Sequence, residues 1–401
     1  MTTGTEFDGG ERPLPLAGVR VLDLSRVLAG PWCGQVLGDL GAEVIKVEHP
    51  DRGDDTRDWG LPTAGGTTYF DSVNRNKRSL GLDLATEEGA EIARTLAAGS
   101  DVLIQNFKRG GADRLGLGYA RLSAENPRLI YCSVVGYVGD GPEADRPGYD
   151  LVVQGESGLM ALNGRAEDPP LKVGVAAVDL FTGQYAAQGV LAALYERERT
   201  GRGRLVEMAL YDCGLSLTSY VGLAALALGR DPERVGNAHP AIVPYGVFEA
   251  ADGPLVITVG NNAQYRRFCA VIERPDLAED PDYATNLGRS RHRDRLGPQI
   301  EAELARRPRA ALIAALQASG IPCGEVAGLH EAVRSERTAQ AGMLADGDSP
   351  VLAPPYRIDG TRPPVRRPPP GLGAHTGPIL TELGLDAVRI AELRARGIVA
   401  G

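Results

Sequence analysis

Apolar residues in the first half of the chain gather in short runs that alternate with longer amphipathic stretches. The short runs at residues 18–25 (GVRVLDLS) and 42–48 (AEVIKVE), in which Val, Leu and Ile recur, predict buried strands. Residues 30–41 between them predict a helix with Pro31 near its first position. A strand, a helix and a second strand in this order are typical of a βαβ unit with a right-handed crossover and a parallel sheet.

The alternation continues beyond this first unit. Residues 86–99 (TEEGAEIARTLAAG) predict a helix that Thr86 caps and Gly99 ends, and residues 110–127 predict a helix and a turn. Further strands are predicted at residues 78–84, 101–107 and 128–137. The first half is therefore expected to be an open, Rossmann-like α/β domain with a parallel sheet.

The second half has a different texture. The mostly apolar residues 205–229 predict a long packing helix, and residues 241–260 predict a hairpin that turns at Asp252–Gly253. Residues 354–370 are crowded with proline and arginine, which favours an extended connector over a surface. Two short helices are expected to close the chain, and no internal repeat is present.

Composition and charge narrow the class of protein. Of the 401 residues, 43% are hydrophobic and 24% charged, as in an ordinary soluble globular protein. The net charge of −9 argues against nucleic acid or an anionic membrane as a partner. The N-terminal residues 1–13 lack the apolar core of a secretion signal, and no apolar run reaches the length of a membrane span. We therefore expect a cytoplasmic protein.

The cysteines agree with a reducing compartment. They are odd in number, widely spread and free of any C-x-x-C pair, which predicts reduced thiols in place of disulfides or a zinc site. They are Cys33, Cys132, Cys213, Cys269 and Cys323.

Several common chemistries lack their signature. Glu48 ends the second predicted strand where a dinucleotide-binding acid would stand, but Gly30, Gly34 and Gly38 are spaced by four, unlike G-x-G-x-x-G. The five histidines never pair at i, i+3 or i, i+4, so no metal site is expected. No G-x-S-x-G elbow is present, and no sequence feature brings a histidine to a cysteine nucleophile.

Basic residues gather in two predicted loops of the first domain. Either cluster could be a solvated charged face or, at the ligand-binding edge of an α/β sheet, a site for a polyphosphate. The clusters are Arg75, Lys77 and Arg78 in NRNKRS, and Lys108, Arg109 and Arg114 in NFKRGGADR.

Asp179 stands where the small apolar residues 171–178 (LKVGVAAV), predicted as an inner strand, meet a helical pattern that ends at Gly201. Such an aspartate is a favoured helix N-cap. It is also a nucleophile that needs no base, and a helix N-terminus favours its ionised form and offers N–H donors to an oxyanion. The small residues around it leave room for a ligand: Gly174, Ala176, Ala177, Gly183, Ala186 and Ala187. The two interpretations, cap and reagent, carry about equal weight on these residues alone.

The chain resembles the class III CoA-transferases (the CaiB/BaiF type) almost from end to end. The likeness rests on LAGPWCGQVLGDLGAEVIKVE, NRNKRSLGLDL, QNFKRGGADRLGLG, DRPGYDLVVQGESGLM and VGVAAVDLFTGQYAAQGVLAALYERERTGRG. The resemblance implies that Asp179 is the nucleophile that carries CoA as an aspartyl thioester between an acyl-CoA donor and a small carboxylic acid. It implies CoA and acyl-CoA as substrates, no tightly bound cofactor, no metal and an interlocked homodimer. The domains implied are a large α/β domain from residues 14–215 with a returning tail from 335–401, and a small α+β domain from 225–325.

The resemblance also implies contacts with CoA. Lys108 and Arg114 are the expected phosphate ligands, and His49 occupies the place of an arginine in the formyl-CoA enzyme. The full set carried over by position is Leu28, Ala29, His49, Leu82, Ala85, Asn106, Phe107, Lys108, Arg114, Val135, Gly136, Tyr137 and Val138.

Two other activities remain open within this resemblance. The racemases of the family place a histidine before the aspartate of G-H-D, whereas Tyr149 stands here, and Asn261–Gln264 replace the loop that holds their glutamate. A tyrosine with an ordinary pKa near 10 is a poor base at neutral pH. The third reading is a CoA-binding protein without catalysis. The segments GYDLVVQGESGLM and PPLKVGVA favour succinyl-CoA and small dicarboxylates over oxalate.

Overall fold

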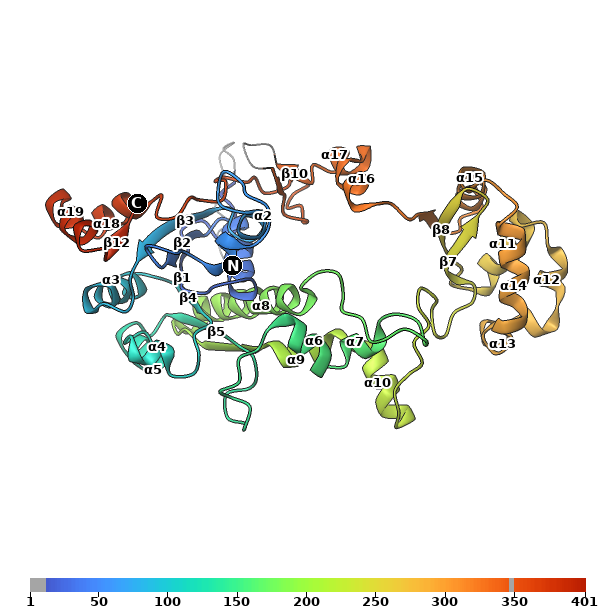
Figure 1. Ribbon diagram of the computed structural model, residues 1–401, viewed down its shortest axis with the longest axis horizontal. Helices are drawn as coiled ribbons and strands as arrows, with labels where there is room; N and C mark the ends of the chain where they lie inside the picture. The colour runs from blue at the N-terminus through green and yellow to red at the C-terminus, as the bar shows by residue number, and fades with distance from the viewer. Residues whose placement is uncertain (1–11, 346–349) are drawn as a thin grey trace, which may run out of the picture. The chain divides into compact units, whose positions relative to one another are not determined.

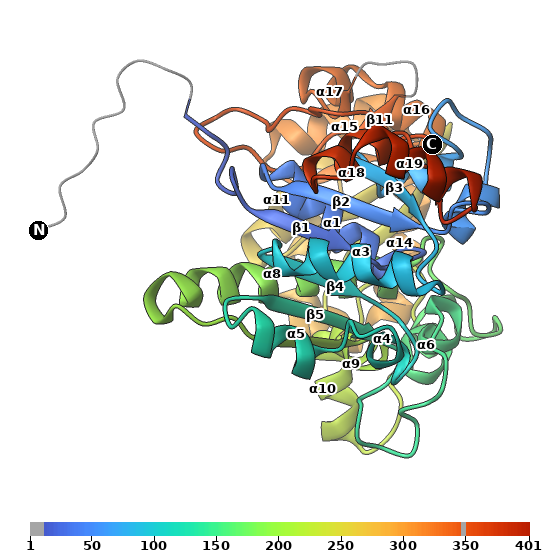
Figure 2. The same ribbon diagram turned by 90° about the vertical axis from the view of Figure 1, so that its left-hand side faces the viewer.

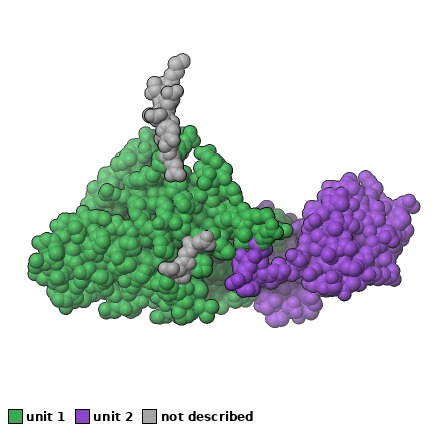
Figure 3. Space-filling view, turned by 90° about the horizontal axis from the view of Figure 1, so that it is seen from above, with its two compact units in different colours: residues 1–160, 172–222, 336–401 green, residues 161–171, 223–335 purple. Residues whose placement is uncertain are grey.

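The computed structural model describes residues 12–345 and 350–401, so the N-terminal stretch that argues against a secretion signal lies almost wholly outside the described part. The chain divides into two compact units (Figure 3). The large unit comprises residues 1–160, 172–222 and 336–401, and the small unit comprises residues 161–171 and 223–335.

A seven-stranded sheet forms the centre of the large unit (Figure 1). Its order is β12-β3-β2-β1-β4-β5-β6, and the neighbours are parallel except for β12, which pairs antiparallel with β3. The strands are β1 (Arg20–Asp23), β2 (Glu43–Glu48), β3 (Lys77–Leu82), β4 (Val102–Gln105), β5 (Ile130–Val135), β6 (Leu205–Ala209) and β12 (Val399–Ala400). The α/β prediction with a parallel sheet is confirmed, and the order reverses direction between β1 and β4.

Helices cover both faces of this sheet, so apolar residues of its inner strands are buried on both sides. Val21 packs on one face and its neighbour Leu22 on the other. On the first face lie α1 (Ala29–Asp39), α6 (Asp150–Glu156), α8 (Ala177–Thr200) and α9 (Leu210–Leu217). On the second lie α3 (Glu87–Ala98), α4 (Gly111–Arg114), α5 (Tyr119–Glu125), α18 (Thr376–Glu382) and α19 (Ala387–Ala395). Figure 2 shows α3 and α5 on the side of the sheet toward the viewer.

Two predicted helices had different outcomes. The helix at residues 86–99 is confirmed, since Thr86 Oγ1 accepts the Gly89 N–H and Gly99 is the C-cap. The single helix at residues 205–229 is wrong, because Leu205–Ala209 pair with β5 as the edge strand β6. The remainder forms α9 and α10 (Ser219–Leu228), which bend by 79° at their junction.

The C-terminal part of the large unit returns across the sheet. Residues 354–370 form no helix and no regular strand, as predicted, but the chain turns at Asp359–Gly360 in place of running extended throughout. Arg366 Nη2 donates to the carbonyls of Gly38 and Ala42 at 2.7 and 3.0 Å. The remaining elements are η1 (Asp55–Asp58), α2 (Thr68–Ser72), α17 (Glu336–Gln340), β10 (Leu344–Ala345) and β11 (Val351–Leu352), with α7 (Leu159–Leu162) at the unit boundary.

The small unit has its own core around a three-stranded antiparallel sheet of β7 (Tyr245–Ala250), β8 (Gly253–Thr258) and β9 (Cys323–Glu325). Ala250 pairs with Gly253, so the hairpin turns at Ala251–Asp252, one residue before the predicted position. Gly253 has a φ of +138°, which suits glycine at the start of a strand. Its helices are α11 (Asn262–Val271), α12 (Pro275–Glu279), η2 (Pro281–Tyr283), α13 (Asn286–Arg291), α14 (Arg293–Leu304), α15 (Arg309–Ala318) and α16 (Leu329–Arg334).

Within the described ranges, no single helix is both long and apolar enough to cross a membrane, although the bent pair α9 and α10 reaches that composition together.

Candidate active site

Two neighbouring cavities open at the carboxyl ends of the parallel strands, where the strand order reverses. Ligands of open α/β sheets bind at this place, because the loops after the two central strands diverge there. The first cavity has a volume of about 390 Å³ and the second about 270 Å³, and both contact Arg26 and Phe107.

Most of the residues predicted to contact CoA lie on these two cavities. The first is lined by Leu28, Ala29, Asn106, Phe107, Lys108, Arg114, Val135 and Gly136, and the second by His49, Leu82, Ala85 and Phe107. Tyr137 and Val138 line neither: the Tyr137 hydroxyl donates to Glu156 Oε2 at 2.5 Å, and Val138 is exposed. The CoA contacts themselves stay a prediction.

Asp179 lines the first cavity together with Tyr149. The predicted strand before it is absent, since residues 170–176 form no regular element. Helix α8 begins at Ala177 with Ala176 as its N-cap, so Asp179 is the third helical residue and is not the cap. Its side chain is buried on the first turn.

The cap of α8 comes from Asp150, at the start of α6. Asp150 Oδ1 accepts the N–H groups of Val178 and Asp179 at 2.8 and 3.3 Å. Its other oxygen accepts from Gln154 Nε2 at 2.6 Å, and Gln154 Oε1 accepts from Val173 N at 2.8 Å. Because Asp150 takes these donors, the expected supply of α8 N–H groups to an oxyanion is also wrong.

The Asp179 carboxylate therefore does not cap α8. No side chain or backbone N–H in the part of the chain that the structure describes donates to it. Burial first, and then the negative Asp150, raise the pKa of Asp179 to about 7. The positive end of the α8 dipole acts in the opposite direction and favours the anion. The acid is therefore poised to change charge near neutral pH.

The small residues near Asp179 serve helix packing more than ligand access. A Cβ on Gly183 would lie 2.4 Å from the Ala29 carbonyl oxygen, so this glycine lets α8 lie against the start of α1. Ala186 and Ala187 are fully buried in the same contact layer. Gly174, in contrast, has open space where a Cβ would stand, and Ala176 and Ala177 are partly exposed.

The two basic clusters lie in different environments. Lys77 and Arg75 are buried in ion pairs with Asp23 and Asp39, and Arg78 pairs with Glu382. This cluster is neither a solvated face nor a phosphate site. Lys108, Arg109 and Arg114 of the second cluster all line the first cavity.

Glu48 is also held by hydrogen bonds within the fold. Its oxygens accept from Arg57 Nε and Nη2 at 2.7 and 2.8 Å and from Ser79 Oγ at 2.6 Å. It is thus not available to a ribose hydroxyl. All five cysteines are free thiols, and the described residues contain no group of three metal-binding side chains.

Comparison with known proteins identifies the family to which the chain is similar over nearly its whole length. Residues 16–376 match the family described as CoA-transferase family III. The chain is 41% identical over 389 residues to a succinate–glutarate CoA-transferase of Agrobacterium fabrum, which covers 94% of this chain and 97% of the relative. It is 38% identical to the succinyl-CoA:glutarate CoA-transferase of Mus musculus over 100% of this chain and 93% of the relative. A solved structure of a CaiB/BaiF family protein from Brucella suis matches with a TM-score of 0.83 and 40% identity, over 93% of this chain and 100% of that one.

Proposed function

Because the chain belongs to CoA-transferase family III, we propose that Asp179 is the residue that carries CoA from an acyl-CoA donor to a carboxylic acid acceptor. The observation that carries this proposal is the buried carboxylate of Asp179 on the wall of the larger cavity, to which no described residue donates a hydrogen bond. An ionised carboxylate is nucleophilic without a base, so the absence of a catalytic triad is no obstacle.

The first half of the reaction exchanges the acid bound to CoA. A carboxylate oxygen of Asp179 attacks the thioester carbonyl of the donor, the C–S bond breaks, and an acyl-aspartyl anhydride and CoA thiolate result. The thiolate then attacks the Asp179 carbonyl, which releases the donor acid and leaves an aspartyl-CoA thioester.

The second half runs the same steps in reverse. The acceptor carboxylate attacks the aspartyl thioester carbonyl and expels CoA thiolate, which then attacks the acceptor carbonyl of the new anhydride. Asp179 leaves as a carboxylate, and the acceptor leaves as its CoA thioester. Each bond broken is replaced by one of similar acyl-transfer reactivity, so no ATP is consumed.

The cavity walls support a large anionic substrate. Lys108, Arg109 and Arg114 supply positive charge on the first cavity, which suits the phosphates of CoA. The names of the relatives support succinyl-CoA as the donor and a small dicarboxylate such as glutarate as the acceptor.

The enzyme is further proposed to act as a homodimer in the cytoplasm. The exposed apolar side chains of Tyr220, Leu223, Leu226 and Leu228 on α10 support an association of this kind, because apolar surface on a helix favours burial against a partner. The five free cysteines support a reducing compartment. Light scattering on the purified protein tests the dimer, and a compact monomer would contradict it.

The decisive experiment incubates the protein with succinyl-CoA, glutaryl-CoA and acetyl-CoA and measures its intact mass. We expect a gain equal to CoA less one water, located on Asp179 by peptide mapping and missing from Asp179→Ala. Transfer of CoA to labelled glutarate and succinate is measured in parallel.

The other readings give different outcomes. A racemase takes up deuterium from the solvent at the α-carbon of a branched acyl-CoA and needs no acceptor, whereas a silent binder binds CoA without an adduct. Absence of both adduct and transfer across the panel would overturn the transferase proposal.

A further inference from the structure

The loop between β1 and α1, residues 25–28, forms part of the wall of the larger cavity. Arg26, Val27 and Leu28 all line this cavity. The loop leaves β1 at the point where the strand order reverses, so its path decides the shape of the wall beside the site.

Val27 has an unusual backbone conformation. Its φ is +70°, in the left-handed region that β-branched residues rarely adopt. Such a conformation is strained and persists only where the surroundings hold it.

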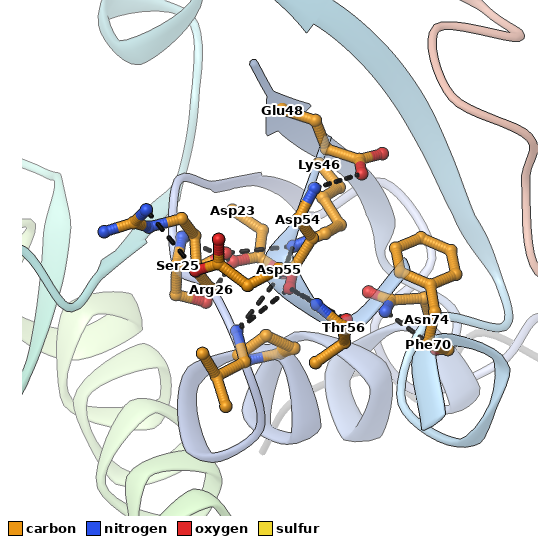
Figure 4. Close-up of polar contacts among 12 residues, drawn as sticks. Asp23, Ser25, Arg26, Lys46, Glu48, Asp54, Asp55, Thr56, Phe70 and Asn74 are labelled. Atoms are coloured by element: carbon orange, nitrogen blue, oxygen red, sulfur yellow. Dashed lines mark hydrogen bonds and ion pairs between the residues drawn. The ribbon is translucent and has the colours of Figure 1, made fainter. Parts of the chain in front are cut away.

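Two fully buried charged groups, Lys46 and Asp54, bond to this loop (Figure 4). Lys46 Nζ, from β2, donates to the Ser25 carbonyl at 2.9 Å and to Asp54 Oδ2 at 2.8 Å. Both carboxylate oxygens of Asp54 accept from the Val27 N–H at 3.3 Å. Asp54 is itself fixed, because its Oδ1 accepts from the N–H and hydroxyl of Thr56 at 3.0 and 2.8 Å.

Asn106 holds the same loop from the side of β4. Its Oδ1 accepts the Arg26 N–H at 2.9 Å, and its Nδ2 donates to the Arg26 carbonyl at 2.8 Å. The amide expected to contact CoA is therefore already bonded to the loop. Bonds from β2, from the segment before η1 and from the end of β4 converge on three consecutive residues.

We propose that Lys46 and Asp54 are positioning residues that hold Val27 in its left-handed conformation and so keep the cavity wall ready for acyl-CoA. The inference rests on the proposed function of the cavity. Neither Lys46 nor Asp54 lines the larger cavity, so the pair can act on its wall only through the loop, although Asp54 also lines the second cavity.

The energetics give the size of the expected effect. Without the pair, the loop relaxes toward negative φ at Val27, and the binding-competent shape becomes a minor population. The apparent dissociation constant rises by the inverse of that population, about tenfold for a strain of 1.4 kcal/mol. Once acyl-CoA is bound the shape is restored, so kcat changes less than KM.

The test removes the pair as a unit with Lys46→Met and Asp54→Leu, because an apolar replacement of both partners is better tolerated than a lone buried charge. The matched control, Arg75→Met with Asp39→Leu, removes another buried pair of the large unit that bonds no residue of the loop. CoA binding is measured by calorimetry, kcat and KM by CoA transfer, and stability by urea unfolding.

We expect KM and the dissociation constant of CoA to rise about tenfold in the first double variant and less than about threefold in the control, at comparable losses of stability. Adding Val27→Gly to the first double variant is expected to restore binding, since glycine adopts a φ of +70° without strain. Val27→Ala, which trims the side chain but keeps Cβ, is expected to restore little. Should the first double variant not fold, Lys46→Met with Asp54→Ala removes the same bonds with a smaller side chain and provides the same comparison.

Equal binding by wild type and the double variant would overturn the inference, and so would equal rescue by Val27→Gly and Val27→Ala. A wild-type protein that binds no CoA would instead overturn the proposed function of the cavity.

Discussion

Two sets of buried charges lie close together in the large unit and have opposite character. On the inner strands of the sheet, Lys46 and Lys77 pair with Asp54 and Asp23 at 2.8 Å, and all four side chains are fully buried. On the cavity wall, Asp179 is also buried but has no donor among the described residues. The first set satisfies each charge, whereas the second leaves one carboxylate facing a cavity.

The difference appears in the pKa values. Burial alone would raise the pKa of Asp54, but the ammonium of Lys46 and the bonds from Thr56 hold it below its usual range. Burial and a like charge both raise the pKa of Asp179, to about 7. Partners offset the desolvation of the Asp54 carboxylate, whereas the Asp179 carboxylate, without a donor among the described residues, costs stability when it is ionised.

The largest effect is expected from removing the unpartnered acid. Asp179→Ala should lower CoA transfer at least about 10⁴-fold, because the covalent route is lost with the nucleophile. CoA binding should change less than about threefold, since the cationic cavity residues remain. Transfer kinetics and calorimetry check the two values, and a variant with one tenth of wild-type activity would contradict the assignment.

Breaking the paired set should instead damage the fold. Lys77 Nζ donates to Asp23 Oδ2, to the Pro31 carbonyl and to Asn74 Oδ1 at 2.8–3.0 Å. Lys77→Met leaves these acceptors buried without a donor, at an expected cost of about 3–5 kcal/mol in the free energy of unfolding. Urea unfolding measures the loss.

The control is an exposed pair. Arg121 and Glu125 form an i, i+4 ion pair on the surface of α5, and Arg121→Met should cost less than about 0.5 kcal/mol. A similar loss in both variants would remove the distinction between buried and exposed pairs.

The sequence predicted the parts of the fold that depend on local pattern, since the strands of the sheet and the helix from Thr86 to Gly99 follow from periodicity and capping. The role of Asp179 as reagent came from the family resemblance and stays a prediction. The partners were not predictable, because they are distant in sequence. Asp150 lies 29 residues before Asp179, and Asp23 lies 54 residues before Lys77, so the sequence cannot show that Lys77 is buried in place of solvated.

The helix prediction for Leu205–Ala209 was wrong for a related reason. A short apolar run fits a buried helix or an edge strand equally well, and only its pairing with β5 decides between them. The prediction of Asp179 as an N-cap was wrong because Asp150, from α6, accepts the Val178 N–H at the start of α8. The Asp179 carboxylate therefore does not cap its own helix.

Asp179→Asn sharpens the contrast through stability. The pKa of the wild-type Asp179 rises from 3.8 in the unfolded chain to about 7 in the native state, so the native state favours the protonated acid. The penalty is absent below pH 4, grows as pH rises from 4 to 7, and is complete above that range. The amide removes it, so we expect a gain of at most about 4 kcal/mol at pH 8 and almost none at pH 4. Equal gains in urea unfolding at both pH values would contradict the raised pKa.

The smallest effect tests the like charge of Asp150. Asp150→Asn keeps an oxygen that accepts the Val178 N–H but removes the negative charge next to Asp179. The pKa of Asp179 should fall, and because the anion is the nucleophile, the acid limb of the pH–rate profile should move to lower pH by roughly half a unit to one unit.

Two further variants separate charge from capping. Gln154→Leu removes one bond to Asp150 but keeps its charge, so the limb should stay in place. Asp150→Ala removes charge and cap together, so the limb should move as in Asp150→Asn while α8 loses about 1 kcal/mol of capping stability. If the acid limb of the pH–rate profile does not move in Asp150→Asn, the raised pKa of Asp179 comes from burial alone, and Asp150 acts only as the cap of α8.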